Sequence, residues 1–266
     1  MVKKATKQEE MVEEVTEKEG KGGNNLELPY GYVDKDGNLH KEFEIREMTG
    51  ADEEEIAQGS IRNNAGKIIT TILGNCVTRI GDFKQQTTED EFWNKIMKHL
   101  YIGDRNYILL KLRELTYNGE IEFEDRCPTC GEDLNVYLKT DEVEIIEPPK
   151  DPSHIEFELP KGCKHDGGTH KKGYFELPKG GDQEILHKVA QKNLGKANTT
   201  LMFKTVRQLG DAPLSSRTFR NLGKMDREHL TEKIGDNRFG PDFEVEVVCE
   251  TCGDEIIIGI NPVNFI

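Results

Sequence analysis

Apolar and polar residues alternate in some stretches of the chain and recur at a helical period in others. Residues 32–48, YVDKDGNLHKEFEIREM, place Asp36 and Gly37 as a turn and alternate through Phe43 and Ile45, which predicts a half-buried β-hairpin. Two helices are expected near 89–101 and 104–116. A further helix is predicted from about 66 to 79, with an apolar face made of Ile68, Ile69, Ile72, Leu73, Cys76, Val77 and Ile80.

Two Asp-Arg pairs recur where helices are expected to begin. Asp104 and Arg105 open one such segment, and Asp226 and Arg227 open another. Aspartate is a favoured N-cap because its carboxylate accepts hydrogen bonds from the free N–H groups of the first turn. We therefore expect each aspartate to cap its helix and each pair to take part in an ion pair between helices.

The chain contains an internal repeat. LELPYG at 26–31 returns as FELPKG at 157–162, and ITTILGNCVTRIGD at 69–82 resembles NTTLMFKTVRQLGD at 198–211. Residues 103–138 also align with residues 225–260 without a gap. The repeat predicts an α+β protein of two lobes, each with a few helices, a β-hairpin and a zinc-ribbon-like pair of strands around a Cys-x-x-Cys turn. The lobes are expected to span 26–147 and 155–266, joined by a Pro-rich linker at 148–154.

The repeat gives each lobe one Cys-x-x-Cys-Gly turn. One such turn supplies two thiolates, half of the tetrahedral shell of a structural zinc ion, and the turn of the other lobe can supply the rest. We therefore predict one structural Zn²⁺ that is held by Cys127, Cys130, Cys249 and Cys252. Gly131 and Gly253 follow the turns and would let backbone N–H groups face the sulfurs. The shared ion would join the two lobes.

Other uses of these cysteines fit the sequence less well. A redox Cys-x-x-Cys motif belongs at the start of a helix, whereas both turns here lead into alternating strands. A nucleobase-deaminase site would need the H-x-E motif on a helix, but His40 of the HKE motif at 40–42 falls in a predicted strand. Disulfides are disfavoured because no secretion signal is present. A zinc enzyme would need an open coordination position, which four thiolates close.

Three further residues have side chains that can bind metals. Cys163, His165 and His170 lie together in GCKHDGGTHKKG, a glycine-rich turn. Whether they bind a second metal stays open from the sequence. Cys76, in contrast, lies on the apolar face of a predicted helix and is expected in the core.

Charge and composition limit the partners. The net charge is −14, and acidic residues flank both cysteine turns, whereas phosphate backbones need basic side chains. No apolar run has the length of a membrane span. The sequence shows no catalytic, cofactor or small-molecule motif beyond the predicted zinc site, so no catalytic residue is assigned. Residues 1–25 alternate Lys and Glu without a secretion signal and are expected to form a disordered tail of a cytosolic protein.

Three segments together resemble a known family. They are EFEIREMTGADEEEI at 42–56, ITTILGNCVTRIGD at 69–82 and GDRNYILLKLRELTYNGEIEFEDRCPTCGEDL at 103–134. Their order and spacing resemble the T4-type baseplate hub assembly chaperone family of contractile-tailed bacteriophages, also called T4 base plate proteins. The resemblance implies a non-enzymatic phage protein that acts in assembly or structure of the baseplate hub. It also implies baseplate or tail proteins as partners, in the host cytoplasm during virion assembly or in the finished baseplate.

The second half of the chain departs from the family pattern. In the first half, REMTGADE contains a predicted capping box formed by Thr49 and Asp52. The second half keeps an acid at the corresponding helix start, Asp182, but has no counterpart of Arg46. Any role of Arg46 in binding a partner therefore does not extend to the second half. The leading alternative function is a zinc-ribbon factor that acts on nucleic acid or in transcription, which would need basic residues beside the cysteines.

Overall fold

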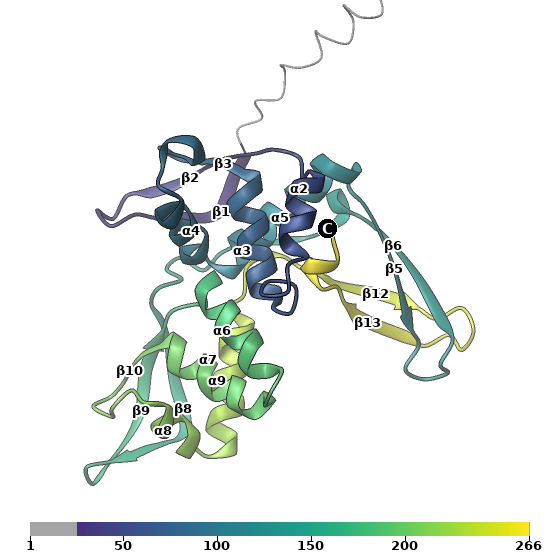
Figure 1. The fold of residues 1–266 in the computed structure, drawn as a ribbon. Coiled ribbons are helices and arrows are strands. Elements are labelled where there is room, and N and C mark those ends of the chain that lie inside the picture. The colour runs from purple at the N-terminus through teal and green to yellow at the C-terminus, as the bar shows by residue number, and fades with distance from the viewer. Residues whose placement is uncertain (1–25, 266) are drawn as a thin grey trace, which may run out of the picture.

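The computed structural model describes residues 26–265, which form two stacked bodies and a projecting arm (Figure 1). We call residues 26–117 the N-terminal body and residues 155–239 the C-terminal body. The cysteine arm consists of the strands β5 (Glu120–Arg126), β6 (Asp133–Lys139), β12 (Glu244–Val248) and β13 (Glu255–Gly259). The predicted tail at 1–25 lies outside the described residues. The described residues combine helices with antiparallel strands, so the fold is α+β as expected.

The N-terminal body packs helices against an antiparallel sheet of order β1-β2-β3-β4. Its strands are β1 (Leu26–Val33), β2 (Leu39–Ile45), β3 (Val77–Ile80) and β4 (Phe83–Lys84), and its helices are α2 (Gly50–Ile56), α3 (Ala65–Cys76), η1 (Gln85–Thr87), α4 (Asp90–His99) and α5 (Ile102–Tyr117). Phe43, Ile72, Leu73 and Ile96 are fully buried between the sheet and the helices. The predicted hairpin, α4 and α5 all form near their expected positions, and the Thr49–Asp52 capping box is confirmed.

The predicted helix over 66–79 is wrong at its end. Helix α3 stops at Cys76, and Val77–Ile80 is a strand that pairs with β2, with Ile80 opposite Phe43. Val77 and Ile80 are buried in the strand, and apolar residues at these positions would also fit the buried face of a helix, so their apolar character does not distinguish the two. The β-branched residues and the free edge of β2 favour the strand, because pairing satisfies the backbone groups of both segments.

The C-terminal body has a sheet of order β10-β9-β8 beside its helices. The strands are β8 (Ile155–His165), β9 (Gly168–Phe175) and β10 (Val206–Leu209), and the helices are α6 (Gly180–Ala190), α7 (Leu194–Thr205), α8 (Ser216–Asn221) and α9 (Lys224–Asp236). Its core includes Phe175, Met202 and Phe219, and it also takes in Tyr101 from the N-terminal side. Asp182 accepts a hydrogen bond from the Lys179 N–H at the start of α6, as its predicted place at a helix start implies.

The N-cap predictions for Asp104 and Asp226 are wrong. Helix α5 begins one turn earlier with Tyr101 as N-cap, and Asp104 instead accepts hydrogen bonds from the N–H groups of Tyr30 (2.8 Å) and Gly31 (3.2 Å). These N–H groups lie at an irregularity in the pairing of β1 with β2, where the ladder provides no acceptor. Asp226 in α9 accepts from the N–H groups of residues 161 and 162 in the same way.

The expected ion pairs of the two arginines are also absent from the described residues. Arg105 donates to the carbonyl oxygens of Met97 and Gly66, and Arg227 donates to those of Phe219 and Gly195. Each arginine therefore ties the end of one helix to the beginning of another. Backbone carbonyls at these positions, rather than a carboxylate, accept hydrogen bonds from the guanidinium groups, and the Nε of Arg105 has no hydrogen-bond partner within the described residues.

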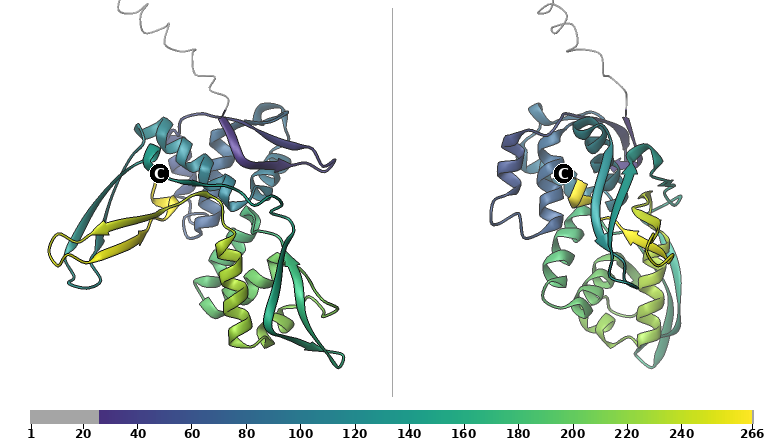
Figure 2. Two further views of the ribbon diagram at one scale, coloured as in Figure 1. Left: turned by 180° about the vertical axis from the view of Figure 1, so that it is seen from behind. Right: turned by 90° about the vertical axis from the view of Figure 1, so that its right-hand side faces the viewer.

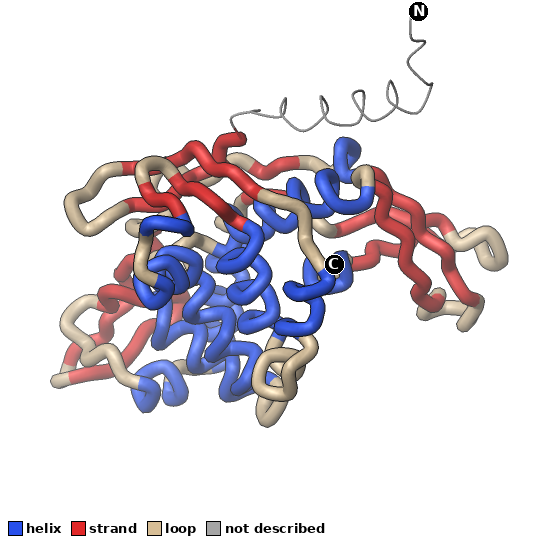
Figure 3. The backbone as a smooth tube through the Cα atoms, turned by 45° about the horizontal axis from the view of Figure 1, so that its top comes forward, coloured by secondary structure: helices blue, strands red, loops and turns tan. Residues whose placement is uncertain are grey.

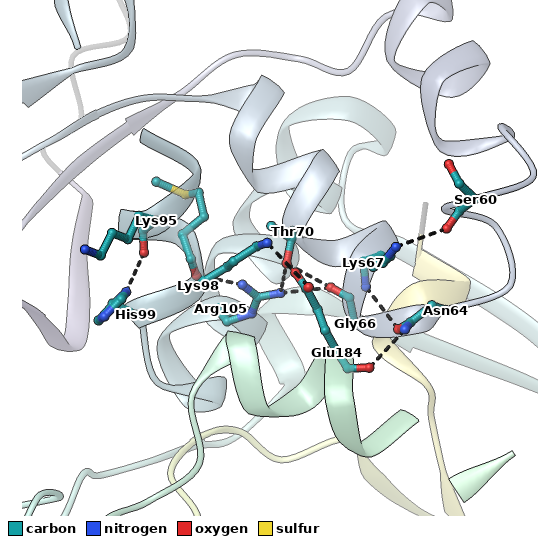
Figure 4. Close-up of polar contacts among 11 residues, drawn as sticks. Ser60, Asn64, Gly66, Lys67, Thr70, Lys95, Lys98, His99, Arg105 and Glu184 are labelled. Carbon is teal, nitrogen blue, oxygen red and sulfur yellow. Dashed lines mark hydrogen bonds and ion pairs between the residues drawn. The ribbon is translucent and has the colours of Figure 1, made fainter. Parts of the chain in front are cut away.

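The helices of the two bodies lie together in the middle of the molecule, with sheets toward the outside (Figure 3). Figure 4 shows the contact between α3 and α6, where the Asn64 side chain donates to the Glu184 carbonyl (2.9 Å) and the Thr70 hydroxyl donates to the Glu184 carboxylate (2.6 Å). A Cβ on Gly66 would lie 2.6 Å from the Glu184 nitrogen, so the close approach of the helices requires glycine there. The N–H of Gly180 also donates to the Leu100 carbonyl (3.0 Å).

The cysteine arm projects away from both bodies (Figure 2). At its base, β7 (Ile145–Ile146) pairs with β11 (Gly240–Pro241), and an apolar cluster joins Leu110, Ile121, Phe243 and Ile260. Residues 145 and 146 therefore belong to a sheet just before the predicted linker. The short helices η2 (Thr140–Glu142) and η3 (Pro262–Phe265) complete the described elements. No helix in residues 26–265 is long and apolar enough to span a membrane.

Candidate metal centre

Two β-hairpins bring the four cysteines to the tip of the arm. Strands β5 and β6 pair in continuous register, from Glu120 opposite Lys139 to Arg126 opposite Asp133, and β12 pairs with β13 in the same way. Side chains of alternate residues therefore point to one face of each hairpin. The two apolar faces pack against each other, and the cluster at the tip contains Cys127, Leu134, Val136, Cys249, Ile258 and the partly buried Phe123, Val245, Val247 and Ile256.

The two cysteine turns have the same backbone geometry. In the first, the Gly131 N–H donates to the Cys127 carbonyl (2.8 Å) and the Cys127 N–H donates to the carbonyl of residue 132 (2.9 Å). In the second, the Gly253 N–H donates to the Cys249 carbonyl (2.7 Å). The φ angles of Gly131 and Gly253 are +78° and +76°, a region that residues with a Cβ rarely occupy. Each glycine therefore closes a turn that no other residue would close without strain.

The four sulfurs form a compact group. The Sγ atoms of Cys127 and Cys252 are 3.7 Å apart, as are those of Cys130 and Cys249, and all four lie within 4.8 Å of one another. A tetrahedron with Zn–S bonds of about 2.3 Å has edges of about 3.8 Å, which matches these separations. A disulfide would need sulfurs about 2.05 Å apart, so all four are free thiols. The donor set fits a tetrathiolate metal site.

The surroundings of the thiols differ within the group. Cys127 and Cys249 are buried, whereas Cys130 and Cys252 are exposed on the outside of the tip. The backbone N–H of Cys130 makes the largest contribution to lowering the pKa of Cys127 to about 7. The Asp254 N–H favours the thiolate of Cys252, but partial loss of hydration beside the other sulfurs and hydrogen bonding among the thiols outweigh it and raise that pKa to about 12. Crowded thiols thus resist losing all their protons unless a cation compensates the charge.

A contact between the two turns was not anticipated from the sequence. The Thr129 hydroxyl donates to the Asp254 carboxylate, and this bond joins the first hairpin to the second beside the sulfurs. Thr129 lies between Cys127 and Cys130, and Asp254 follows Gly253. The sequence shows only that a polar residue lies inside one cysteine turn and an acidic residue just after the other. That the two form a hydrogen bond is evident only once the structure places the turns face to face.

The other residues singled out from the sequence do not join this group. Cys76 is fully buried in the N-terminal core, as expected, and burial raises the pKa of its thiol to about 11. His40 lies on β2 and its Nε2 is 3.1 Å from an oxygen of Asp34. His40 therefore lies on a strand, as predicted, whereas the H-x-E motif of a deaminase belongs on a helix.

The Cys163, His165 and His170 side chains are close in the β8–β9 hairpin without forming a ligand group. Cys163 pairs with His170 across the strands, and the two histidine rings are 6.2 Å apart. The Nδ1 of His170 accepts a hydrogen bond from the Asp211 N–H (3.2 Å), and its Nε2 lies 3.3 Å from the His165 carbonyl. Within residues 26–265, the only group of three or more suitable ligands found within reach of one ion is the four-cysteine group.

Comparison with known families gives one match. A family model described as "T4 bacteriophage base plate protein" matches residues 32–166, just over half of the chain. The matched segment runs from β1 to the tip of β8 and contains the first cysteine turn but not the second. Comparisons with curated proteins and with solved structures find no match.

Proposed function

The chain belongs to the T4 bacteriophage base plate protein family, and from this premise we propose that it is a non-enzymatic zinc protein of the baseplate hub. The family supports a structural or assembly role in the phage baseplate. We propose more narrowly that the protein assists assembly of the hub of a contractile tail through contacts with other tail proteins. It would work in the host cytoplasm during virion assembly and need no small-molecule substrate.

We propose that one Zn²⁺ binds Cys127, Cys130, Cys249 and Cys252. The observation that carries this proposal is the 3.7 Å separation of sulfurs that come from residues more than a hundred positions apart. A tetrahedral group of four sulfurs suits zinc, and it also suits iron. Four thiolates leave no open position for a substrate, so the ion would act as a structural link whose binding adds to the free energy of folding.

We also propose that the chain arose by internal duplication into lobes at 26–147 and 155–266 with a linker at 148–154. Paired contacts support this proposal. Asp104 and Asp226 accept from equivalent N–H groups, and Arg105 and Arg227 bond to equivalent helix ends. The cysteine turns also share their hydrogen bonds. Such contacts depend on several residues at once, so a common origin accounts for them more simply than chance.

The charge of the arm supports protein partners over nucleic acid. Its exposed residues carry many carboxylates around the cysteine turns, namely Glu120, Glu122, Glu124, Asp125, Glu132, Asp133, Glu244, Glu246, Glu250, Asp254 and Glu255. Nucleic-acid-binding zinc ribbons need cations at such positions to replace counterions on the phosphates. The basic residues of the arm are Arg126, which pairs with Asp133 (2.9 Å), and Lys139 at the end of β6.

Elemental analysis of the purified protein tests the metal proposal. We expect about one zinc per chain, and we expect a chelator to release four thiols together. The Cys249→Ser/Cys252→Ser variant should lose the zinc, whereas Cys163→Ser, which changes a cysteine outside the site, should keep it. Iron in place of zinc would contradict the identity of the ion, whereas two ions per chain or full zinc in the double variant would contradict the shared site.

Infection with the phage that encodes this chain tests the assembly role. A tagged copy should co-purify with baseplate proteins from infected cells, and loss of the gene should stop baseplate assembly. Comparison of assembly intermediates with finished particles then separates a transient chaperone from a structural component. Normal tails in the absence of the protein would contradict the proposal.

A further inference from the structure

Two adjoining cavities in the C-terminal body are lined by basic side chains. The first, of about 560 Å³, lies between α7, α8 and the start of α9 and is lined by Lys196, Arg217, Arg220 and Arg227 together with small polar residues. No carboxylate lines this cavity among the described residues. A cavity with four cations and no acid is unusual in a chain whose net charge is −14.

Arg217 also lines the second cavity, of about 610 Å³, so the two cavities are neighbours that share this side chain. This cavity adds Lys161 and Lys164 from β8, and its carboxylate, Asp226, is 1% exposed and already accepts hydrogen bonds from the backbone of residues 161 and 162. We call the six cations that line the two cavities the basic surface: Lys161, Lys164, Lys196, Arg217, Arg220 and Arg227.

The charges of the basic surface are not compensated within the described part of the chain. None of its six side chains lies within 4.0 Å of a carboxylate there, as an ion pair would require. Arg227 donates to the Phe219 carbonyl (2.6 Å) and to the Gly195 carbonyl (3.3 Å), which holds its position without neutralising its charge. Elsewhere, the partly buried Arg79 and the exposed Arg238 pair with Glu44 and Asp242. The basic surface therefore has cations available for an anion from outside.

Exposed apolar side chains lie beside the same residues in the sequence. Leu194 is 72% exposed and stands between two residues that line the first cavity. Met225 is 52% exposed, and Leu214, between two residues of the second cavity, is 36% exposed. Phosphate groups of nucleic acid or small anions would gain nothing from these side chains. A protein segment that carries both carboxylates and apolar residues would use both features.

The helix at the corresponding place in the N-terminal body has no net positive charge, because Asp90 and Glu91 balance Lys95 and Lys98. Helix α4 lies between β4 and α5, as α8 lies between β10 and α9, and it begins with the acids Glu89, Asp90 and Glu91. Helix α8 has Arg217 and Arg220 and no acidic residue. The two bodies therefore differ in surface charge, although their buried aspartates and the arginines that follow them make equivalent contacts.

We propose that the basic surface binds an acidic segment of a partner protein, one in which glutamate or aspartate alternates with apolar residues. Guanidinium groups of Arg217 and Arg220 would bind its carboxylates, and Leu194, Leu214 and Met225 would contact its apolar side chains. The inference names the chemistry of a partner and rests on the proposed role in protein contacts. It does not depend on the metal, because no cysteine ligand lies in the C-terminal body.

Fluorescence anisotropy with a labelled peptide of repeating Glu-Glu-Leu tests the proposal on the zinc-loaded full chain. We expect saturable binding that weakens as salt rises, since exposed charges are screened. Arg217→Glu/Arg220→Glu should weaken binding at least about tenfold, a loss of about 1.4 kcal/mol. Leu194→Ser/Met225→Ser should also weaken it while preserving the salt dependence.

The matched control is Lys84→Glu/Lys95→Glu, which makes the same change in net charge at exposed positions of the N-terminal body. It should bind the peptide as the native chain does, and circular dichroism should show that all variants are folded. Absence of binding at low salt, or an equal loss in the control variant, would overturn the proposal. Tighter binding of duplex DNA or inorganic phosphate than of the peptide would also overturn it. Because the assay uses purified protein, its failure leaves the infection experiment as a separate test of the baseplate role.

Discussion

Arg105 is the largest side chain that is completely buried among the described residues. It donates to the Met97 carbonyl (2.7 Å) and to the Thr70 hydroxyl (3.1 Å), and that hydroxyl donates to Glu184. Burial lowers the pKa of Arg105 to about 10, while the charge of Glu184 opposes the change. The guanidinium stays charged at neutral pH and fixes α3, α4 and α5 where α6 packs against them.

Replacement of Gly180 tests the fit around Arg105. A Cβ at position 180 would collide with the Arg105 guanidinium, so Gly180→Ala should destabilise the protein by about 1–3 kcal/mol. Its neighbour Gly181 is the control, since a Cβ there would find its nearest neighbours at 3.7 Å. Gly181→Ala should be neutral or stabilise by up to about 1 kcal/mol. Urea unfolding of both variants measures the difference, and equal effects would contradict the close packing.

Asp104 gives a prediction about pH. Burial is the main cause that raises its pKa from 3.8 to about 6, and hydrogen bonds from the N–H groups of Tyr30 and Gly31 oppose the rise. The folded protein therefore holds this proton at a pH where the unfolded chain has released it. The resulting stabilisation is present below about pH 4 and is lost as pH rises through 6. The free energy of unfolding should fall with rising pH in this window by up to about 3 kcal/mol.

The Asp104→Asn variant isolates this effect, because asparagine does not titrate. The free energy of unfolding of the native chain minus that of the variant should decrease from pH 4 to pH 7, as measured by urea unfolding. Asp52→Asn is a control that should show the opposite pH dependence. A hydrogen bond from Arg46 holds the pKa of Asp52 well below its usual range. The stabilisation by Asp52 is present above pH 4 and is lost below it. A pH-independent difference for Asp104→Asn would refute its titration.

At the scale of elements, each half of the cysteine arm is only a two-stranded hairpin. Isolated hairpins of this kind are at best marginally stable in water. The arm has a small apolar cluster at its tip and another at its base, between which the strands run outside both bodies. The proposed metal site closes the tip, so the order of the arm should depend on the ion more than the order of the bodies does.

Hydrogen exchange with and without a chelator tests this dependence. Removal of zinc should speed amide exchange in residues 120–139 and 244–259 and leave the buried core of α3 and α5 protected. Cys163→Ser should respond to the chelator as the native chain does. Equal loss of protection in the arm and in α3 would contradict an element-specific role of the metal.

The sequence could predict most of the elements from local patterns and the cysteine group from the internal repeat. Cys127 and Cys130 were expected to meet Cys249 and Cys252 on the basis of the repeat, and their sulfurs do lie together. The strand after Cys76 and the bonds of Asp104 could not be predicted locally. They depend on which backbone groups β1 and β2 leave unpaired, and those groups are defined only by the assembled sheet.

At the scale of the whole molecule, the two halves of the chain meet in several places. Helix α6 packs against α3, Tyr101 enters the C-terminal core, and the four strands of the arm come equally from both sides of the linker. Each body also has its own apolar cluster. The halves are therefore expected to depend on each other without being a single core.

Separation of the chain between residues 150 and 151 tests this relation. The fragments 1–150 and 151–266 should associate when they are produced together, with about one zinc per pair. A chelator should weaken the association at least about tenfold, which corresponds to about 1.4 kcal/mol. Size-exclusion chromatography with metal analysis measures both results. Two folded fragments that do not associate in the presence of zinc would contradict the shared arm.

The division of the cysteine group between distant parts of the chain has a consequence for synthesis on the ribosome. After Cys130 is made, about 120 residues must be added before Cys252 exists. At about 5–20 residues per second this takes roughly 6–25 s. During that interval the first hairpin has two thiols and an apolar face with Phe123 and Val136 but no partner for either. Translation speed and the supply of metal in the infected cell therefore set how long the thiols and the apolar face of the first hairpin can form incorrect contacts.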